Sequence, residues 1–206
     1  MPSKIAPDIV VARLPLYLRA LAEMQSQGRQ FTSSQEIGAA LGIGSAQIRK
    51  DLSHFGEFGK QGMGYSVAEL MARLRQILHI DREWPVVIIG AGLIGRAVAN
   101  YSGFAHRGFR VTGVFDNDGG KLGERVGEHV VQHIDALADC VRSNGVRVAM
   151  ISVPAAFAQT VAEVLVAAGI EAILNYAPVN LNVPANVRVE NIDPVLHLQH
   201  MTYYLD

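Results

Sequence analysis

The sequence predicts an α/β chain in two parts, a helical N-terminal part and a C-terminal part in which strands alternate with helices. Helix-capping signals and apolar stripes with helical spacing continue as far as residue 84. A continuous apolar run, Pro85–Ile89, then leads directly into a glycine-rich turn, as expected of a buried parallel strand. Half of the 206 residues are hydrophobic and 18% are charged. Such a chain is too apolar to be disordered.

The distribution of charge points to the N-terminal part as the one that contacts a polyanion. The formal net charge is −1, but residues 1–84 hold ten Lys/Arg against eight Asp/Glu, whereas residues 85–206 hold eight against eleven. One cysteine, Cys140, excludes a disulfide framework. Neither a signal-peptide core nor an apolar run of roughly 18 residues is present, so we expect a cytoplasmic protein without a membrane partner.

Helices are predicted along the first part in order. An apolar stripe predicts a helix over 14–27, closed by Gly28. Ser33, with Glu36 three residues later, forms a capping box that opens a second helix. That helix is short, because the glycines of residues 42–44 end it within about two turns.

Two further helices follow. Ser45 is expected to cap a third helix over residues 46–55. The glycines of residues 56–64 form a hairpin-like loop, and a second capping box at residues 66–69 starts a fourth helix.

The second and third helices, joined by a short glycine-containing turn, predict a helix-turn-helix motif. The start of the second helix of such a motif lies in the major groove, and the loop at 56–64 is a candidate wing for the minor groove. Arg and Gln read base edges, while Lys and Ser contact phosphates. The alternative, that Arg49 and Lys50 are ordinary solvated charges, is outweighed by the turn, the positions and the wing together. We expect the DNA-contacting residues to be Ser45, Gln47, Arg49, Lys50, Ser53, His54, Lys60 and Gln61.

The glycine turn after Pro85–Ile89 matches a dinucleotide-binding fingerprint. Gly90 permits the tight turn, Gly92 lets the backbone approach a pyrophosphate, and Gly95 lets the helix pack on the strand. The following helix offers its N-terminal N–H groups to the phosphates. A second strand, residues 110–115, ends in an acidic residue 21 positions beyond Gly95, where a ribose is bound in such folds.

That acidic residue, Asp116, predicts NAD(H) rather than NADP(H). Its carboxylate accepts hydrogen bonds from the ribose hydroxyls and repels a 2′-phosphate, and no arginine stands beside it. Asp118 is either a helper or a turn former. The expected cofactor-binding residues are Gly90, Ala91, Gly92, Leu93, Ile94, Gly95, Arg96, Tyr101, Asp116, Asp118, Val153 and Pro154.

The alternation of strands and helices continues to residue 174. Helices are predicted over 135–144 and from Pro154 to Gly169, and strands over 146–153 and 172–174. Residues 152–154 and 175–178 follow these strands, at the sheet edge where ligands bind in open α/β folds. They either line the nicotinamide pocket or are simple strand-to-helix turns.

The remaining residues are too few for a substrate domain, so we expect no catalytic residues and no enzyme. A strand over 186–191 and a terminal helix over 194–206 are predicted, and this helix is apolar over much of its circumference. Such a helix needs a partner surface, which we interpret as a dimer contact. His197 and His200 stand three residues apart, but no third ligand is near them, so surface or interface positions are favoured over a metal site.

The chain resembles the redox-sensing transcriptional repressors of the Rex family over nearly its whole length. The motifs that carry the resemblance are residues 13–17, 47–53, 55–59, 62–65, 115–118, 175–178 and 189–193.

This resemblance implies a homodimer that represses respiratory and fermentative genes. Family members bind operator DNA with NAD⁺ or an empty site and are released by NADH. It also implies a winged helix-turn-helix domain over 1–80, a Rossmann-type doubly wound NAD(H)-binding domain over 81–192, and a C-terminal helix over 193–206 swapped between subunits. By the same resemblance, Arg19, Tyr101 and Asp193 belong to the switch between domain orientations.

Two other functions are compatible with the sequence. One is a small NAD-dependent oxidoreductase whose helical N-terminal part is a dimerisation cap. The other is a redox-insensitive regulator that binds CoA or another nucleotide.

Overall fold

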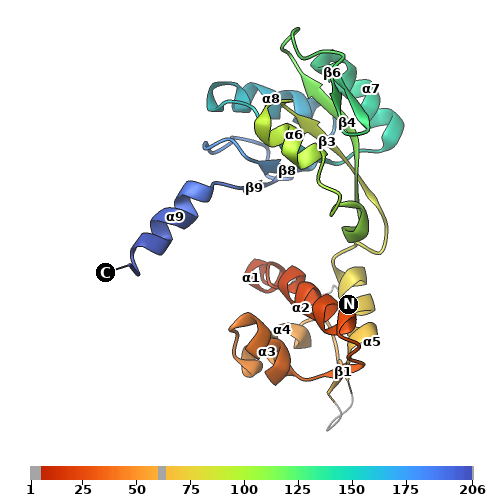
Figure 1. Ribbon diagram of the computed structural model, residues 1–206, viewed down its shortest axis with the longest axis vertical. Coiled ribbons are helices and arrows are strands. Elements are labelled where there is room, and N and C mark those ends of the chain that lie inside the picture. The colour runs from red at the N-terminus through yellow and green to blue at the C-terminus, as the bar shows by residue number, and fades with distance from the viewer. Residues whose placement is uncertain (1–5, 60–63, 206) are drawn as a thin grey trace. The chain divides into compact units, whose positions relative to one another are not determined.

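The computed structural model describes residues 6–59 and 64–205, and the chain divides into two compact units, Met1–Arg82 and Glu83–Asp206 (Figure 1). Each unit has its own hydrophobic core. The predicted fold class, a helical DNA-binding type of domain followed by an α/β domain, is confirmed.

Helices make up most of the N-terminal unit. Its described elements are α1 (Asp8–Val11), α2 (Leu14–Ser26), β1 (Phe31–Thr32), α3 (Ser34–Leu41), α4 (Ser45–Ser53), β2 (Tyr65–Ser66) and α5 (Val67–Ile77). The predicted stripe on α2 is buried in part, since Leu14 and Leu21 are almost fully inaccessible to solvent but Leu16 is 37% exposed. Tyr17, which the predicted stripe did not include, is buried beside them. They pack against Ile48 of α4 and Leu74 of α5, so the core holds the three helices together.

The helix starts of this unit agree with the sequence in one case and differ in another. Ser33 and Glu36 form the predicted capping box at α3. Ser45 does not cap α4, because Gly44 already has the extended backbone of a capping residue and Ser45 is the first helical residue. The strand β2 pairs antiparallel with β1, a partner more than 30 residues earlier that the sequence pattern did not indicate.

Seven strands form a single sheet in the C-terminal unit. The described elements are β3 (Trp84–Ile89), α6 (Leu93–Ala99), β4 (Phe109–Asp116), β5 (Arg125–Val126), β6 (His129–His133), α7 (Leu137–Asn144), β7 (Val148–Ile151), α8 (Ala155–Ala167), β8 (Ala172–Asn175), β9 (Arg188–Asn191) and α9 (Pro194–Thr202), with 3₁₀ turns at Ala105–Arg107 and Ile134–Ala136. The strand order is β5-β6-β4-β3-β7-β8-β9. All neighbours are parallel except β5 and β6.

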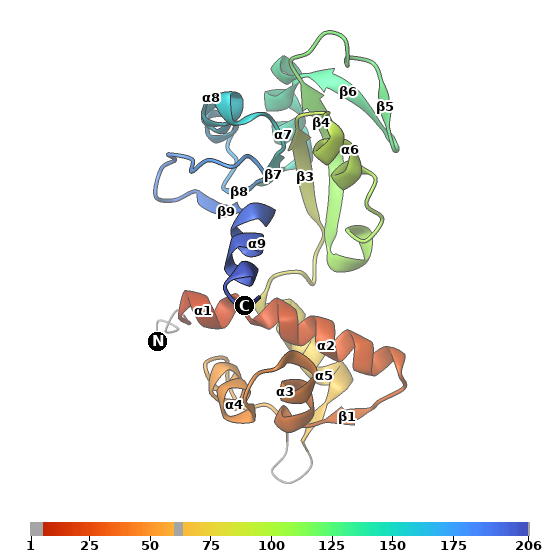
Figure 2. The same cartoon turned by 60° about the vertical axis from the view of Figure 1, so that its left-hand side comes forward.

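Helices cover both faces of this sheet, with α6 on one face and α7 and α8 on the other (Figure 2). Alternate residues of β3 belong to the two faces. Val86 and Ile88 pack toward α6, and Val87 and Ile89 pack toward α7 and α8. Burial on both sides explains why β3 is a continuous apolar run. The chain runs outward from β3 in one direction to β4 and β6 and then returns to β7 on the other side. In such folds nucleotides bind at the carboxyl ends of the two strands where the direction reverses, which are β3 and β7 here.

The sequence pattern did not predict two strands of this unit, β5 and β6. β5 and β6 form an antiparallel hairpin at the sheet edge, and β6 contains His129, Gln132 and His133 in only five residues. Edge strands tolerate such polar side chains, so the apolar pattern of a buried strand is missing. The predicted strand over 146–153 is shorter in the structure, because β7 ends at Ile151.

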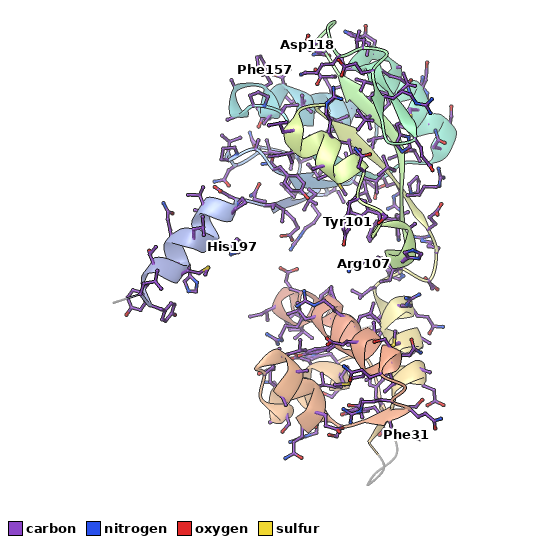
Figure 3. The ribbon with its side chains drawn as sticks, in the orientation of Figure 1. Phe31, Tyr101, Arg107, Asp118, Phe157 and His197 are labelled. Atoms are coloured by element: carbon purple, nitrogen blue, oxygen red, sulfur yellow. The ribbon has the colours of Figure 1, made fainter. Side chains whose placement is uncertain are left out.

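The last helix, α9, has few contacts with the rest of its unit. Asp193 caps it, since its Oδ1 accepts a hydrogen bond of 2.9 Å from the backbone N–H of Val195. Its large apolar side chains are exposed, namely Val195, Leu196, Leu198 and Met201. His197 also projects from this helix (Figure 3).

Candidate nucleic-acid interface and dinucleotide site

The helix-turn-helix in the N-terminal unit is built from α3, the turn 42–44 and α4. Gly42 has a left-handed backbone with φ +67°, which a glycine adopts without strain. Gly38, inside α3, lets the turn approach closely, because a Cβ there would lie 2.3 Å from the Ile43 carbonyl oxygen. Ile48 and Leu52 anchor the inner face of α4 in the core, so the opposite face of α4 is left to solvent.

Five of the predicted DNA-contacting residues are exposed on or just beyond α4, and Ser45 is half-buried at its start. The five exposed residues are Gln47, Arg49, Lys50, Ser53 and His54. Arg49 reaches back to α3, where its Nη1 donates a hydrogen bond of 2.9 Å to Ser34 Oγ. The Ser53 hydroxyl donates to the Lys50 carbonyl oxygen at 2.7 Å, within its own helix. The other two predicted residues, Lys60 and Gln61, lie outside the described residues.

The base of the predicted wing is fixed by two glycines. Gly59 and Gly64 both have positive φ angles, +77° and +74°. A Cβ on Gly59 would lie 2.2 Å from the Gly64 carbonyl oxygen, and one on Gly64 would lie 2.3 Å from the Thr32 carbonyl oxygen. Gly59 therefore lies close to Gly64, and Gly64 lies close to β1 just before β2 begins.

A buried carboxylate under α4 is a feature that the sequence did not reveal. Asp51 is 0% exposed and accepts two hydrogen bonds from the Arg13 guanidinium, from Nε at 2.6 Å and from Nη2 at 2.8 Å. The Tyr17 hydroxyl donates to it at 2.6 Å and Gln47 Nε2 at 2.7 Å. The network therefore joins α2 to the outer face of α4.

These hydrogen bonds keep Asp51 charged. Burial raises the pKa of its carboxyl, but the donors Arg13, Tyr17 and Gln47 outweigh that effect and lower the pKa to about 2. Burial, together with the hydrogen bond to Asp51, raises the pKa of Tyr17 to about 12. The pair is thus an ion pair with a neutral tyrosine across the physiological range.

The glycine turn of the C-terminal unit has the geometry of a phosphate cradle. Gly90 has φ +102°, and a Cβ there would lie 2.5 Å from the Ser152 carbonyl oxygen. A Cβ on Gly95 would lie 1.8 Å from the Gly90 carbonyl oxygen, so only glycine lets α6 pack on the turn. Space is open beside Gly92, which precedes the first turn of α6. The backbone is therefore accessible beside Gly92, where the fingerprint predicts that a diphosphate approaches.

Asp116, at the carboxyl end of β4, is held against this turn. Its Oδ2 accepts a hydrogen bond of 2.8 Å from the Ala91 N–H, and its Oδ1 accepts one of 2.9 Å from the Asp118 N–H. Lys121 Nζ lies 3.1 Å from Asp116 Oδ2 and 3.3 Å from Asp118 Oδ2. Burial raises the pKa of Asp116, but these donors outweigh it and lower the pKa, so the carboxylate is an acceptor suited to ribose hydroxyls.

Lys121 is the member of this site that sequence reasoning missed. The available signal is a lysine five residues after Asp116, the carboxylate predicted to bind the ribose. This lysine lies in a turn that is closed by the hydrogen bond from the Gly120 N–H to Asp118 Oδ1 at 3.0 Å. That bond shows Asp118 acting as a turn former, and the residue lies beyond the carboxyl end of β4 (Figure 3).

The segment after β7 contacts the glycine turn directly. Ser152 Oγ lies 2.9 Å from the Gly90 carbonyl oxygen and 3.1 Å from that of Ile89. Val153 approaches the same turn, since its Cγ1 would lie 3.0 Å from a Cβ on Gly90. The structure thus brings together the predicted residues after β3 and those after β7.

Asn175 organises the loop after β8. It is fully buried, and its side-chain amide donates to the carbonyl oxygens of Ala177 at 3.1 Å and Val179 at 2.8 Å and to Asn191 Oδ1 at 2.9 Å. The loop is therefore tied to β9, the strand that leads to α9.

Three other predicted residues have defined surroundings. Arg96 donates from Nε to the Ala91 carbonyl oxygen at 2.9 Å and forms an ion pair with Glu124, so its side chain braces the glycine turn. Tyr101 is 49% exposed and packs edge-to-face on Phe104 with ring centroids 5.2 Å apart. Arg19, in the other unit, is exposed on α2.

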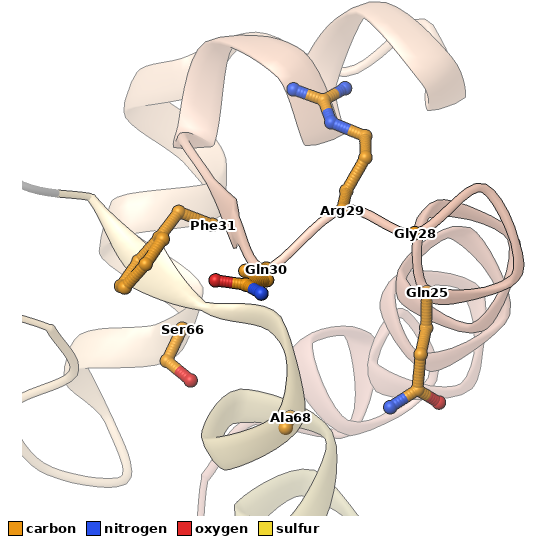
Figure 4. Close-up of a pocket in the computed structure, with 7 residues that line it drawn as sticks. All are labelled: Gln25, Gly28, Arg29, Gln30, Phe31, Ser66 and Ala68. Carbon is orange, nitrogen blue, oxygen red and sulfur yellow. The ribbon is translucent and has the colours of Figure 1, made fainter.

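A shallow pocket in the N-terminal unit, with a volume of about 400 Å³, coincides with neither predicted site (Figure 4). It lies between the end of α2, β1 and the start of α5, and its lining includes Gln25, Phe31 and Ala68. Its one charged lining residue, Arg29, forms an ion pair with Glu36. We therefore assign it no ligand.

The described residues contain neither a cluster of metal ligands nor a membrane-spanning helix. Among residues 6–59 and 64–205, no three His, Cys, Asp or Glu side chains are grouped as metal ligands. No helix in that part of the chain has the length and apolar character needed to span a membrane.

Comparisons with known proteins agree with both halves of the molecule. Residues 5–53 match the family "Putative DNA-binding protein N-terminus", and residues 81–179 match the family "CoA binding domain". Among solved structures, RSP in complex with β-NAD⁺ and operator DNA is 37% identical with a TM-score of 0.92, covering 98% of this chain and 93% of that one. RSP in complex with β-NADH is 35% identical with a TM-score of 0.89, covering 98% and 95%.

Curated relatives are similar over the same length. The redox-sensing transcriptional repressor Rex of Chloroflexus aggregans is 50% identical, covering 97% of this chain and 94% of the relative. That of Roseiflexus sp. is 49% identical, covering 97% and 90%, and that of Streptomyces coelicolor is 45% identical, covering 98% and 78%. The chain therefore belongs to the Rex family of redox-sensing transcriptional repressors.

Proposed function

We propose that this protein is an NAD(H)-responsive transcriptional repressor that binds operator DNA as a homodimer and is released when NADH binds. The observation that carries the proposal is the full-length similarity to RSP, a repressor solved both with β-NAD⁺ and operator DNA and with β-NADH. The two sites described above are an exposed helix-turn-helix and a glycine-rich turn. They supply one binding site for DNA and one for NAD(H). The relatives are regulators rather than enzymes, and this chain is a regulator as well.

The proposal divides the work among three parts of the chain. Residues 1–80 bind DNA, residues 81–192 bind NAD(H), and residues 193–206 form a helix that is swapped between subunits. The exposed apolar side chains of α9 support a partner subunit as their cover, since large apolar surface is seldom left to water on a helix. We also propose a cytoplasmic location, because operator DNA and NAD(H) are both present in that compartment.

For DNA, we propose that α4 enters the major groove and that the wing contacts the neighbouring minor groove. The proposed contacts are Ser45, Gln47, Arg49, Lys50, Ser53 and His54 from the α4 region and Lys60 and Gln61 from the wing. The exposure of the outer face of α4 supports this assignment.

For the cofactor, we propose that the turn from Gly90 to Arg96 binds the diphosphate and that Asp116 binds the adenosine ribose. Asp118, Val153, Pro154 and Tyr101 complete the proposed site. The open space beside Gly92 and the ionised, hydrogen-bonded Asp116 fit this ligand. A negative carboxylate at that position disfavours a 2′-phosphate, which supports NAD(H) over NADP(H).

For the switch, we propose that the cofactor's redox state changes the spacing of the two α4 helices of the dimer, with Arg19, Tyr101 and Asp193 taking part. Two such helices read one face of DNA when the half-sites are about 34–36 Å apart. A change in the population of the DNA-competent state from about 99:1 to 1:99 takes about 5.5 kcal/mol. Each of two NADH molecules supplies half of that, which is a preference of about 100-fold for the released state. The nicotinamide ring is cationic in NAD⁺ and neutral in NADH, so an apolar pocket distinguishes the two forms.

The test begins with DNA selected by the purified protein from a random library, because the operator is not given by the chain. Affinity for the selected DNA is then measured by fluorescence anisotropy across a range of NADH:NAD⁺ ratios at constant salt. We expect tight binding without NADH and a decrease of at least 100-fold at saturating NADH. Unchanged affinity at saturating NADH contradicts the switch, and failure to select any DNA contradicts the function.

Reciprocal variants separate the two sites. Arg49→Ala removes one proposed base contact from each subunit of the dimer and is expected to weaken operator binding by at least about 30-fold while NADH affinity stays the same. Asp116→Ala removes charge-assisted hydrogen bonds to the ribose and is expected to weaken NADH binding roughly 10- to 150-fold while leaving NADH-free DNA binding intact.

A further inference from the structure

The buried Asp51 carboxylate touches one of the proposed base-reading side chains, and this contact decides what that side chain can offer to DNA. Both residues lie on α4, one helical turn apart, with Gln47 Nε2 2.7 Å from Asp51 Oδ1. Gln47 is exposed, whereas Asp51 is 0% exposed. Gln47 therefore has an inner partner in the protein and an outer edge open to a ligand.

The chemistry of the carboxylate fixes which way the Gln47 amide faces. An ionised carboxylate only accepts hydrogen bonds, so the –NH₂ group of Gln47 faces Asp51 and the carbonyl oxygen does not. Arg13 and Tyr17 fill the remaining acceptor positions, so each carboxylate oxygen accepts two hydrogen bonds. With Asp51 held on three sides, the Gln47 amide cannot flip without leaving the carboxylate short of a donor.

One N–H of Gln47 is used by Asp51, which leaves its carbonyl oxygen and its second N–H for an outside partner. Adenine presents the matching pair in the major groove, a donor at N6 and an acceptor at N7. Guanine presents two acceptors, N7 and O6, and a glutamine needs both of its amide hydrogens to satisfy them. A glutamine free to turn could do so, but one whose first hydrogen is given to Asp51 cannot.

We propose that Asp51 is a specificity-determining positioning residue, which restricts Gln47 to reading an adenine in each operator half-site. This inference rests on the proposed function, because it assumes that the outer face of α4 lies in the major groove. Arg13 acts one step further back, since its guanidinium holds both oxygens of the carboxylate that holds the glutamine.

The experiment uses the full-length protein without NADH and the DNA that it selects from a random library. Each base pair of one half-site is replaced in turn, and relative affinities are measured by competition. In the wild-type protein, we expect one adenine whose replacement by guanine lowers affinity roughly 5- to 150-fold. Gln47→Ala is expected to remove the preference at that base pair and at no other, which identifies the base that Gln47 reads.

Asp51→Asn then tests the positioning role. Its side chain keeps the size of aspartate but can present a carbonyl or an amide to Gln47, so the adenine-over-guanine preference at the identified base pair is expected to fall to about 2-fold or less. Tyr17→Phe is the matched control, because it removes a donor to Oδ2 and leaves the oxygen that holds Gln47 untouched. The control is expected to keep the wild-type preference at every base pair.

Each outcome decides between distinct conclusions. If the wild-type protein selects no DNA, the proposed function itself is contradicted. Selection followed by an unchanged adenine preference in Asp51→Asn, or by an equal loss at every base pair, overturns this inference alone. A change confined to the base pair identified with Gln47→Ala supports it.

Two further measurements cover the case in which Asp51→Asn fails to fold. The double variant Arg13→Gln/Asp51→Asn removes both charges of the buried pair. Its relative affinities are measured with the same set of base-pair replacements. In the wild-type protein, ¹⁵N relaxation of the Gln47 side-chain amide, assigned by its loss in Gln47→Ala, is expected to show a rigid group. A freely rotating amide overturns the inference without any variant at position 51.

Discussion

Acidification is expected to weaken the N-terminal unit through one identifiable carboxylate, Asp51. The Asp51 pKa is lowered from 3.8 to about 2 in the folded protein. A group with a depressed folded pKa contributes stability that is fully present above its unfolded pKa and is lost as the pH falls through the folded value. A tenfold change in proton affinity is worth about 1.4 kcal/mol, so Asp51 contributes about 2 kcal/mol at neutral pH. This contribution is lost between about pH 4 and pH 2.

The loss should be visible in thermal unfolding. A change of 1 kcal/mol moves the melting temperature of a domain of this size by about 4–8 °C, so Asp51 accounts for a decrease on the order of 10 °C across that pH window. Circular dichroism follows both units, and the fluorescence of Trp84, at the start of β3, identifies the transition of the C-terminal unit. The remaining transition reports on the N-terminal unit.

The double variant Arg13→Gln/Asp51→Asn supplies the control. It lacks both charges, so its melting temperature should fall less between pH 4 and pH 2 than that of the wild-type protein. Glu36, whose pKa is also lowered, chiefly by its hydrogen bond from Arg29, is retained in both proteins and cancels in the comparison. Parallel pH profiles for the two proteins would refute the linkage argued here.

Two further predictions concern DNA binding and assembly. Lys50→Ala should reduce the slope of log affinity against log salt concentration by about 2 for the dimer, because one phosphate contact is lost per subunit. The control is Arg142→Ala, which alters an exposed arginine paired with Asp139 in the other unit and should leave the slope unchanged. Leu198→Asp, on the exposed apolar surface of α9, should shift the protein from dimer to monomer in sedimentation velocity, while the neighbouring Gln199→Asp should not. A dimer that persists in Leu198→Asp would contradict the role given to α9.

The parts of the fold that the sequence predicted are those that depend on local chemistry. The capping box at Ser33 and the glycine turn at residues 90–95 each need particular residue types at fixed spacing, and both are present in the structure. The buried strand β3 was equally visible, because burial on two faces leaves no room for polar residues. The cap assigned to Ser45 was wrong for a related reason, since Gly44 lacks the side chain by which caps are usually identified.

The parts that escaped prediction depend on partners far apart in the chain. Arg13 and Asp51 are separated by 38 residues, and neither residue alone differs from an ordinary surface charge in the sequence. The pairing of β1 with β2 likewise becomes visible only when the chain is folded. The sequence thus indicated which groups can meet a ligand, and the structure added the groups that hold them.

This difference has a consequence for how specificity is assigned in the N-terminal unit. From the sequence, Gln47 is a side chain with two donors and an acceptor that suits more than one base. With Asp51 beneath it, one donor is already used, and the range of bases it can satisfy becomes narrower. The base preference of α4 therefore depends on Asp51 and on Arg13, which bonds the same carboxylate oxygen as Gln47, although neither needs to touch DNA. A comparison of operator preferences that considered only the exposed residues of α4 would miss this dependence.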